Sequence, residues 1–492
     1  MKINYLKSKD NKDIISVDSV LYHSTYNPEK EAERFVSSIQ ADFNPSAILI
    51  IEPGLSFCLK FFKDKFPAAK IGKISIIDEI ENEGNWDFII NYSDFTNKNG
   101  QNPFTNNFNE SDLLNTLLID WPTCKKIFNK ESNIIWKFYK ESLEYAKTLL
   151  VTRTYFEKKW LINSINFFKY TKSIVIPKKG NHSIVIAASG PSLKKALPLL
   201  KKYRNNIILI GLSSAIKPLL YNSIIPDFCI STDGGYWAKK HLYSLLNKNI
   251  PLAVSSEANV PKKMLESLNI IPLCYEDGLS NKLFTLSKIP FMKAERNGTV
   301  SGTAFELAKS LSNNPVYFCG LDLKETTGFQ HTQPNELENE NSLFDNRINT
   351  KDKRLYRSEL PNDSLKIYRD WFCQNGNQQI IRVIEDDKNP QLGSVKDINI
   401  DAFEKILKDL PEQKISFESS QIDSESQKKI LADIEEFIKT NNESDDWKEY
   451  LFPIDYVAIN HCSDSEAKKI QQAKTDEKNS KLIEKIIKIL EK

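Results

Sequence analysis

The stretch Ser189-Gly-Pro-Ser192 stands between two segments with clear secondary-structure patterns. Ile184 to Ala187 forms a short apolar run typical of a buried parallel strand, and apolar residues recur at helical spacing from Leu193 onward. Pro191 and Ser192 suit a helix start. A strand that meets a helix at a tight turn directs backbone N–H groups and the positive end of the helix dipole toward one point, where a phosphate can bind. A plain connector fits the same residues, so both interpretations stay open here.

In the stretch Pro226-Asp-Phe-Cys-Ile-Ser-Thr-Asp-Gly-Gly235, a second predicted strand runs straight into Asp233, Gly234 and Gly235. A carboxylate at this place can coordinate a metal on a diphosphate, or accept a hydrogen bond from a ribose or sugar hydroxyl. Glycine next to it lets a ligand approach the backbone. An Asp-Gly pair also forms ordinary turns. The position after an apolar strand favours the functional interpretation.

Two further groups of polar residues lie later in the chain. Thr299, Ser301 and Thr303 precede a compact helical pattern and provide either an anion- or hydroxyl-binding edge or plain helix capping. Asp322 follows the apolar run Val316–Cys319, and His331 lies in the polar loop after it. Because His331 lies near Asp322 in the sequence, it is a candidate general acid or base, although a lone loop histidine is more often only solvated.

The elements that must position these residues alternate between strands and helices. Further apolar runs predict strands at 206–210, 251–256 and 270–273. Such alternation predicts a parallel sheet, in which ligands bind beyond the carboxyl ends of the strands. Ser189, Asp233 and Asp322 all fall at those ends, so we expect a single ligand-binding edge.

The outer parts of the chain have other patterns. Near the N-terminus, strand Ala47–Ile51, the turn Glu52-Pro-Gly54 and strand Lys73–Asp78 follow the Rossmann order, but one glycine is too few for a dinucleotide fingerprint. We therefore expect a scaffold without a bound nucleotide. Amphipathic helical patterns follow residue 400. The predicted fold is α/β, with an N-terminal Rossmann-like domain at 1–118, a helical linker at 119–172, a doubly wound, Rossmann-like catalytic domain at 173–395 and a C-terminal helical domain at 396–492.

Composition excludes some classes of function. The 492 residues include 67 Lys and Arg against 65 Asp and Glu, a formal net charge of +2 that gives no electrostatic case for nucleic acid. Seven cysteines are scattered without a C-x-x-C pair, as in a reduced protein. The sequence shows no signal peptide and no transmembrane stretch, so a cytoplasmic protein is expected.

Several of these motifs appear together in an order that carries a resemblance. They are His23-Ser-Thr-Tyr-Asn-Pro28 with Glu31-Ala-Glu-Arg34, the turn Ser189-Gly190-Pro191-Ser192-Leu193, Pro226-Asp227 with Asp233-Gly234, Thr299-Val-Ser301 with Ala304, and Gly320-Leu-Asp-Leu323 with Gly328 and His331. Over roughly residues 19–390 the chain resembles the motility-associated factor (Maf) family of flagellin glycosyltransferases. The central domain of that family is similar to archaeal hydroxymethylpterin pyrophosphokinase (MptE-like) and to bacterial sialyltransferases.

The resemblance implies a cytoplasmic enzyme that transfers a nonulosonic acid, such as pseudaminic or legionaminic acid, from a CMP-activated donor to Ser or Thr of flagellin, for flagellar assembly and motility. The donor site would comprise Ser189, Gly190, Pro191, Ser192, Leu193, Gly234, Thr299, Ser301 and Thr303, and the catalytic residues would be Asp233, Asp322 and His331. A divalent metal is an open question. The C-terminal helices are hypothesised to recruit flagellin or its chaperone.

Two other functions remain open from the sequence. One is a non-catalytic, flagellin-binding assembly factor on a degenerate transferase fold. The other is an ATP-dependent pyrophosphokinase, which would need a metal and more than one acidic residue converging on it.

Overall fold

The computed structural model describes residues 1–77, 80, 84–96, 102–325, 327–356, 363–385, 389–462 and 464–491. The chain divides into two compact units, Met1–Tyr155 with Ser444–Lys481, and Phe156–Glu443 with Leu482–Lys492. Asp78, the expected acidic end of an N-terminal strand, lies outside the described residues. The four domain limits given above stay predictions.

The first unit contains two sheets. An antiparallel sheet has the order β1 (Ile3–Lys7), β2 (Asp13–Val17), β3 (Val20–Leu21), and a parallel sheet has the order β6 (Phe88–Asn91), β5 (Lys70–Ser75), β4 (Ala47–Ile51), β7 (Thr116–Asp120). The helices that connect these strands are α1 (Pro28–Ser38), α2 (Leu59–Lys65), α3 (Tyr92–Thr96), α4 (Pro103–Asn107) and α5 (Glu110–Leu114), and α6 (Pro122–Ile127) follows β7. The parallel order agrees with the Rossmann-like pattern of the sequence.

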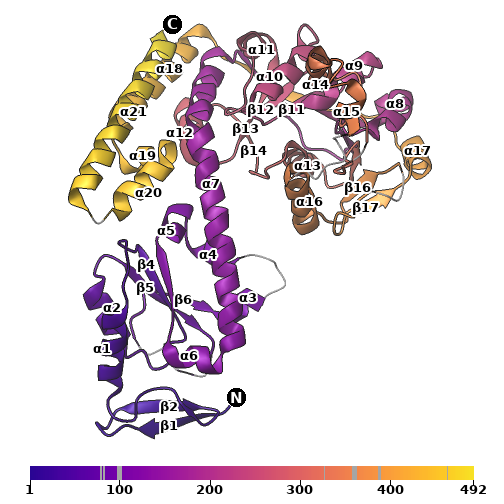
Figure 1. Cartoon of the computed structure of the whole chain (residues 1–492). Helices are drawn as coiled ribbons and strands as arrows, with labels where there is room; N and C mark the ends of the chain where they lie inside the picture. Colours follow the sequence, from indigo (N-terminus) through magenta and orange to yellow (C-terminus); the bar gives the residue numbers. More distant parts are fainter. Residues whose placement is uncertain are drawn as a thin grey trace. The chain divides into compact units, whose positions relative to one another are not determined.

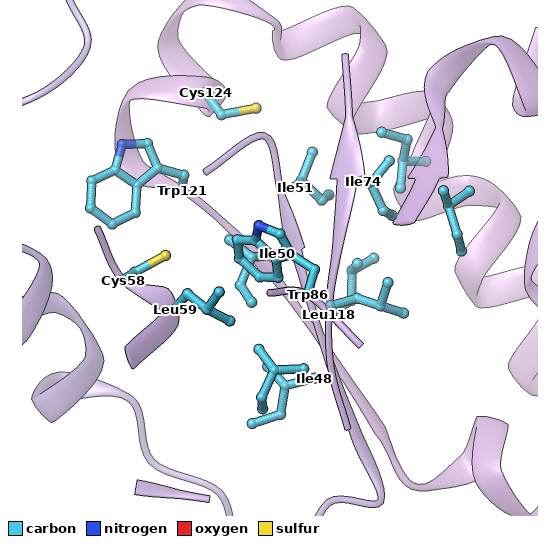
Figure 2. Packing of buried hydrophobic residues seen from close by; sticks show 14 of the residues in the cluster. Ile48, Ile50, Ile51, Cys58, Leu59, Ile74, Trp86, Leu118, Trp121 and Cys124 are labelled. Carbon is cyan, nitrogen blue, oxygen red and sulfur yellow. The ribbon is translucent and has the colours of Figure 1, made fainter. Parts of the chain in front are cut away.

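The core of this unit surrounds β4, all five residues of which are buried. Figure 2 shows Ile48, Ile50 and Ile51 with the buried side chains that pack around this strand. Among these are Trp121 and the thiols Cys58 and Cys124. Burial raises the pKa of Cys58 to about 12, so this thiol stays protonated at neutral pH.

Within the range 119–172 lies one long helix, α7 (Asn129–Tyr170) (Figure 1). Its residues include no proline or glycine that would end a helix. The C-terminal helices are α17 (Ile400–Asp409), α18 (Ser424–Asn441), α19 (Asp445–Leu451), α20 (Pro453–His461) and α21 (Ser465–Glu491). No helix among the described residues is long and apolar enough to cross a membrane.

The second unit is built on a large, mostly parallel sheet. Its described strands have the order β17 (Lys396–Ile398), β16 (Ile380–Val383), β15 (Val316–Cys319), β9 (Ile184–Ala187), β10 (Ile208–Leu212), β11 (Phe228–Ser231), β12 (Leu252–Ser255), β13 (Asn269–Cys274), β8 (Ser173–Pro177) and β18 (Phe417–Gln421), and β14 (Met292–Lys293) also pairs with β13. Only β18 is antiparallel to its neighbour among these strands.

Helices cover both faces of this sheet, as the predicted doubly wound fold requires. α13 (Val300–Leu311) and α16 (Asp363–Asn375) contribute to one buried cluster, and α8 (Leu193–Lys202), α9 (Ile216–Tyr221) and α17 contribute to the other. The remaining helices are α10 (Tyr236–Leu242), α11 (Lys262–Ser267), α12 (Gly278–Ser287), α14 (Glu336–Asn341) and α15 (Lys351–Tyr356), with short 3-10 turns η1 (Arg204–Asn206), η2 (Ser213–Ala215), η3 (Tyr243–Leu245) and η4 (Ser342–Phe344).

The strand order reverses next to β9. From β9 the chain adds β10, β11, β12 and β13 in one direction, and it then returns to place β15, β16 and β17 on the other side of β9. In open α/β sheets this switch point, at the carboxyl ends of the strands, is where ligands bind. The loops after β9 and β15 therefore bound the expected site.

Candidate functional site

The turn after β9 lies against the loop after β15. The Gly190 N–H donates to the carbonyl oxygen of Gly320 at 2.8 Å. A Cβ atom at position 190 would lie 2.5 Å from that oxygen and 2.6 Å from Asp322 Oδ2, which is too close for any side chain. Glycine is required here because two backbone segments and a carboxylate meet.

Asp322 binds the start of helix α8. Its Oδ2 accepts the Ser192 N–H at 2.8 Å. The side chain is buried, and Asp322 Oδ1 and Ser192 Oγ have no hydrogen-bond partner in the described structure. The carboxylate thus interacts with the positive helix end that was predicted to hold a phosphate. The assignment of this turn to the donor phosphate stays a prediction.

Buried Ser189 and part-buried His331 form a polar pair. Ser189 Oγ lies 2.8 Å from His331 Nδ1, and the Ser214 hydroxyl of η2 donates to Ser189 Oγ at 2.8 Å. Burial, with a smaller effect of His241, lowers the pKa of His331 to about 4. The imidazole is therefore neutral at pH 7 and carries one proton and one lone pair.

The loop that carries His331 is fixed by further hydrogen bonds. The Thr332 N–H donates to the Ser189 carbonyl at 2.7 Å, and Thr332 Oγ1 donates to the Gly190 carbonyl at 2.7 Å. Buried Asn335 donates to the Ser214 carbonyl at 3.1 Å. These bonds hold the histidine at the switch point although it lies far from Ser189 in sequence.

Asp233 lies at the carboxyl end of β11, where its carboxylate stabilises a turn. Its exposed carboxylate accepts the Gly235 N–H at 2.7 Å, which is an Asx turn. A Cβ at Gly234 would lie 2.7 Å from Trp160 Nε1. Within the described residues, the Asp233 carboxylate makes no hydrogen bond to the other two predicted catalytic side chains. Its catalytic role stays a prediction.

The hydroxyls of the Thr299–Thr303 segment stabilise the start of α13. Thr299 caps the helix by accepting the Ser301 N–H at 3.3 Å, and Thr303 Oγ1 donates to the Glu295 carbonyl at 3.2 Å. The segment therefore has the capping role that the sequence left open. Any contact with a donor ligand stays a prediction.

The sequence interpretation missed a charged cluster at the same sheet edge. Arg296 donates to Glu257 at 2.6 and 2.8 Å and to Asp277 at 2.7 and 2.9 Å. Its guanidinium lies 4.3 Å from the ring centroid of Tyr275. The three charged residues follow β12, β13 and β14. Glu257 follows an apolar strand, as Asp233 does, so its position in the sequence could have marked it as a candidate site residue.

The acidic side chains do not assemble a metal site within the described residues. No group of three or more His, Cys, Asp or Glu side chains is placed to hold an ion there. Asp233 is engaged in its own turn, and Asp322 binds the α8 N-terminus. This donor set does not fit a divalent ion, so no catalytic step is assigned to one.

Comparison with known proteins supports the fold and part of the family resemblance. Residues 158–328 match the family model of 6-hydroxymethylpterin diphosphokinase MptE-like proteins. The structure of a Maf glycosyltransferase from Magnetospirillum magneticum AMB-1 superposes with a TM-score of 0.57, over 99% of this chain and 92% of that one, at 11% identity. The chain has the Maf fold. The expected resemblance to Maf and MptE-like proteins is thereby confirmed, with the MptE-like segment containing β9 and the switch point.

One sequence relative extends this comparison. An uncharacterized protein of Treponema pallidum (strain Nichols) is 27% identical over 266 residues, which cover 54% of this chain and 58% of that protein. The match thus spans little more than half of that relative's length. Within the Maf fold, the switch point formed by the loops after β9 and β15 is the best-defined candidate site.

Proposed function

We propose that this protein is an O-glycosyltransferase that moves a nonulosonic acid from a CMP-activated donor to Ser or Thr of flagellin, in the cytoplasm. Transfer from a nucleotide sugar needs a site for the nucleotide and a base near the acceptor hydroxyl. The Maf fold and the MptE-like segment support the class of enzyme, and the resemblance of the motifs supports the choice of donor and acceptor.

A single observation carries the location of the donor site. Asp322 Oδ1 and Ser192 Oγ are buried at the switch point without a hydrogen-bond partner among the described residues. Buried polar groups are nearly always paired, and an unpaired one costs roughly 1–3 kcal/mol. A ribose or sugar hydroxyl would satisfy both atoms, because a carboxylate accepts and a serine hydroxyl can do either.

The Ser189–His331 pair would supply the proton transfer. In the proposed tautomer, Nδ1–H of His331 donates to Ser189 Oγ, which also accepts the Ser214 hydroxyl. The lone pair then lies on Nε2 and takes the proton of the acceptor hydroxyl. The acceptor oxygen bonds to the anomeric carbon while the bond from that carbon to the CMP phosphate breaks. The Ser189 hydroxyl hydrogen remains available to the departing phosphate.

The first test is calorimetric titration of the whole chain with CMP, with and without a divalent metal. We expect Asp322→Asn and Ser192→Ala to raise the Kd about tenfold or more, because each removes a proposed partner of the nucleotide. Asp409→Asn, an exposed change of the same kind on α17, is the matched control and should leave the Kd unchanged. Unaltered CMP affinity in both site variants would overturn the proposed donor site.

The family-model match favours a second candidate, an ATP-dependent diphosphokinase. The same titration with ATP and Mg²⁺, followed by an assay with 6-hydroxymethylpterin, distinguishes the two. Diphosphate transfer to the pterin without CMP binding would replace the transferase proposal. Binding of neither nucleotide would favour the assembly factor. Recruitment of flagellin by the C-terminal helices stays a prediction.

A further inference from the structure

A polar pocket of about 320 Å³ lies beside the Asp233 turn, within the second unit. Helix α7, helix α10, helix α11 and the loop between β12 and α11 form its walls. The lining residues are Asn163, Asn166, Phe167, Tyr170, Lys239, Ala258, Asn259, Val260, Pro261, Lys262 and Leu265. This volume is at the small end of the range for small-molecule sites.

The charged side chains that line the pocket are all positive. Lys239 and Lys262 line it, and no carboxylate is among the described lining residues. Lys262 forms a long ion pair with Glu266 on the same helix at 3.7 Å, and its ammonium lies 4.3 Å from the centroid of the Tyr170 ring. The side chains of Lys239 and Asn166 have no hydrogen-bond or ion-pair partner in the described parts of the chain. A partnerless ammonium group facing amides is complementary to an anion.

The amides add acceptors for hydroxyl groups. Asn163 Nδ2 donates to the Glu257 carbonyl at 2.8 Å, and Asn259 Nδ2 donates to the Gly235 carbonyl at 3.2 Å. Both side-chain oxygens are thereby oriented while keeping acceptor capacity. The Tyr170 ring lies beneath the Lys262 ammonium and so helps to position that charge at the pocket.

Asn259 connects the pocket to the Asp233 turn. Its backbone N–H donates to the Asp233 carbonyl at 3.1 Å, and its side chain holds the carbonyl of Gly235. A ligand in the pocket would therefore lie next to the turn that follows β11.

We propose that this pocket binds the carboxylate of a polyhydroxylated acidic sugar through Lys239 and Lys262. The choice of a sugar as ligand rests on the proposed function, whereas the preference for an organic anion follows from the pocket itself. The proposal gives the acidic group of the donor a place separate from the nucleotide site at Asp322. It also makes the two lysines determinants of specificity for acidic over neutral sugars.

The test is calorimetric titration of the whole chain with N-acetylneuraminic acid, with its methyl ester, and with inorganic phosphate. We expect the free acid to bind and the ester, which keeps the hydroxyls but lacks the charge, to bind at least tenfold more weakly. Lys239→Gln and Lys262→Gln should each raise the Kd for the acid about tenfold. Lys263→Gln, at the exposed next position on α11, makes the same charge change outside the pocket lining and should have no effect.

Three outcomes would overturn the proposal. They are no binding of the acid up to roughly 10 mM, equal affinity for acid and ester, and equal weakening by Lys263→Gln and Lys262→Gln. If phosphate binds as tightly as the acid, the pocket is a site for a simple anion and the sugar proposal is wrong. Each variant is also titrated with CMP, which has no carboxylate. CMP binding without acid binding would overturn the proposal for this pocket alone. Acid binding without CMP binding would overturn the proposed transferase function.

Discussion

Gly190 lies where the turn after β9 meets the Gly320 carbonyl and the Asp322 carboxylate. Substitution Gly190→Ala would place a methyl group 2.5 Å from the Gly320 oxygen and 2.6 Å from Asp322 Oδ2, so one of them must move. We expect a loss of about 1–3 kcal/mol in the free energy of unfolding, measured by urea denaturation, together with weaker CMP binding.

Gly298→Ala is the control for this substitution. Its added methyl group meets open space, and its φ of +66° gives strain alone. This variant should lose about 1 kcal/mol of stability and keep its affinity for CMP. Normal CMP binding in Gly190→Ala would contradict the proposed role of Asp322, because the carboxylate could then be displaced without consequence.

His331 links stability to pH. The unfolded histidine titrates near pH 6.5, whereas burial lowers the folded pKa to about 4. Between these values the unfolded chain binds a proton that the folded chain does not, so stability falls as the pH is lowered through this window. One such group changes the free energy of unfolding by at most about 1.4 kcal/mol per pH unit.

Replacing His331 by Gln should reduce this slope, since glutamine has no proton to gain. Urea unfolding of the parent and variant chains at pH 7, 6 and 5 measures the difference. Parallel stability curves over this range would show that His331 is not buried as a neutral group.

At the scale of elements, the segment from residue 400 to Glu443 belongs to the second unit and completes its sheet and core. β18 pairs with β8 over five residues, from Phe417 opposite Pro177 to Gln421 opposite Ser173. Phe403 and Leu407 of α17 are fully buried beside the large sheet. A deletion from Ile400 would therefore remove core and sheet edge together, and it does not test recruitment of flagellin.

Helix α17 provides a sharper test of this integration. Phe403→Ala should lower the free energy of unfolding by about 3–5 kcal/mol, because it leaves a cavity against the sheet. Lys405→Ala, on the exposed face of the same helix, should change it by less than about 0.5 kcal/mol. A small effect of Phe403→Ala would show that α17 is not packed on the central unit.

Elements with strong local patterns could be predicted from the sequence. Strand β9 was predicted within its observed bounds, because four apolar residues precede a Gly-Pro turn. Strand β18 was not predicted, since Phe417-Glu-Ser-Ser-Gln421 has one apolar residue and forms a strand only by pairing with β8. Tertiary context overrides propensity at such edge positions.

At the scale of the whole molecule, the sequence predicted which edge of the sheet carries polar residues but not which of them meet. Ser189 and His331 are separated by 142 positions, and their contact depends on the loop that Thr332 holds against the turn. No local pattern encodes such a pairing. The cluster of Arg296, Glu257 and Asp277 was missed for the same reason, because its members follow three different strands.

The first unit is built from two stretches that lie far apart in the sequence, and this affects how it folds during synthesis. Met1–Tyr155 leaves the ribosome long before Ser444–Lys481, with which it forms one compact unit. The Ser111 hydroxyl, for example, donates to Glu449 at 3.0 Å. At roughly 5–20 residues per second, the wait is on the order of tens of seconds. During that time the nascent N-terminal part exposes the surface that its late partner will cover, so chaperone dependence is expected to be greatest there.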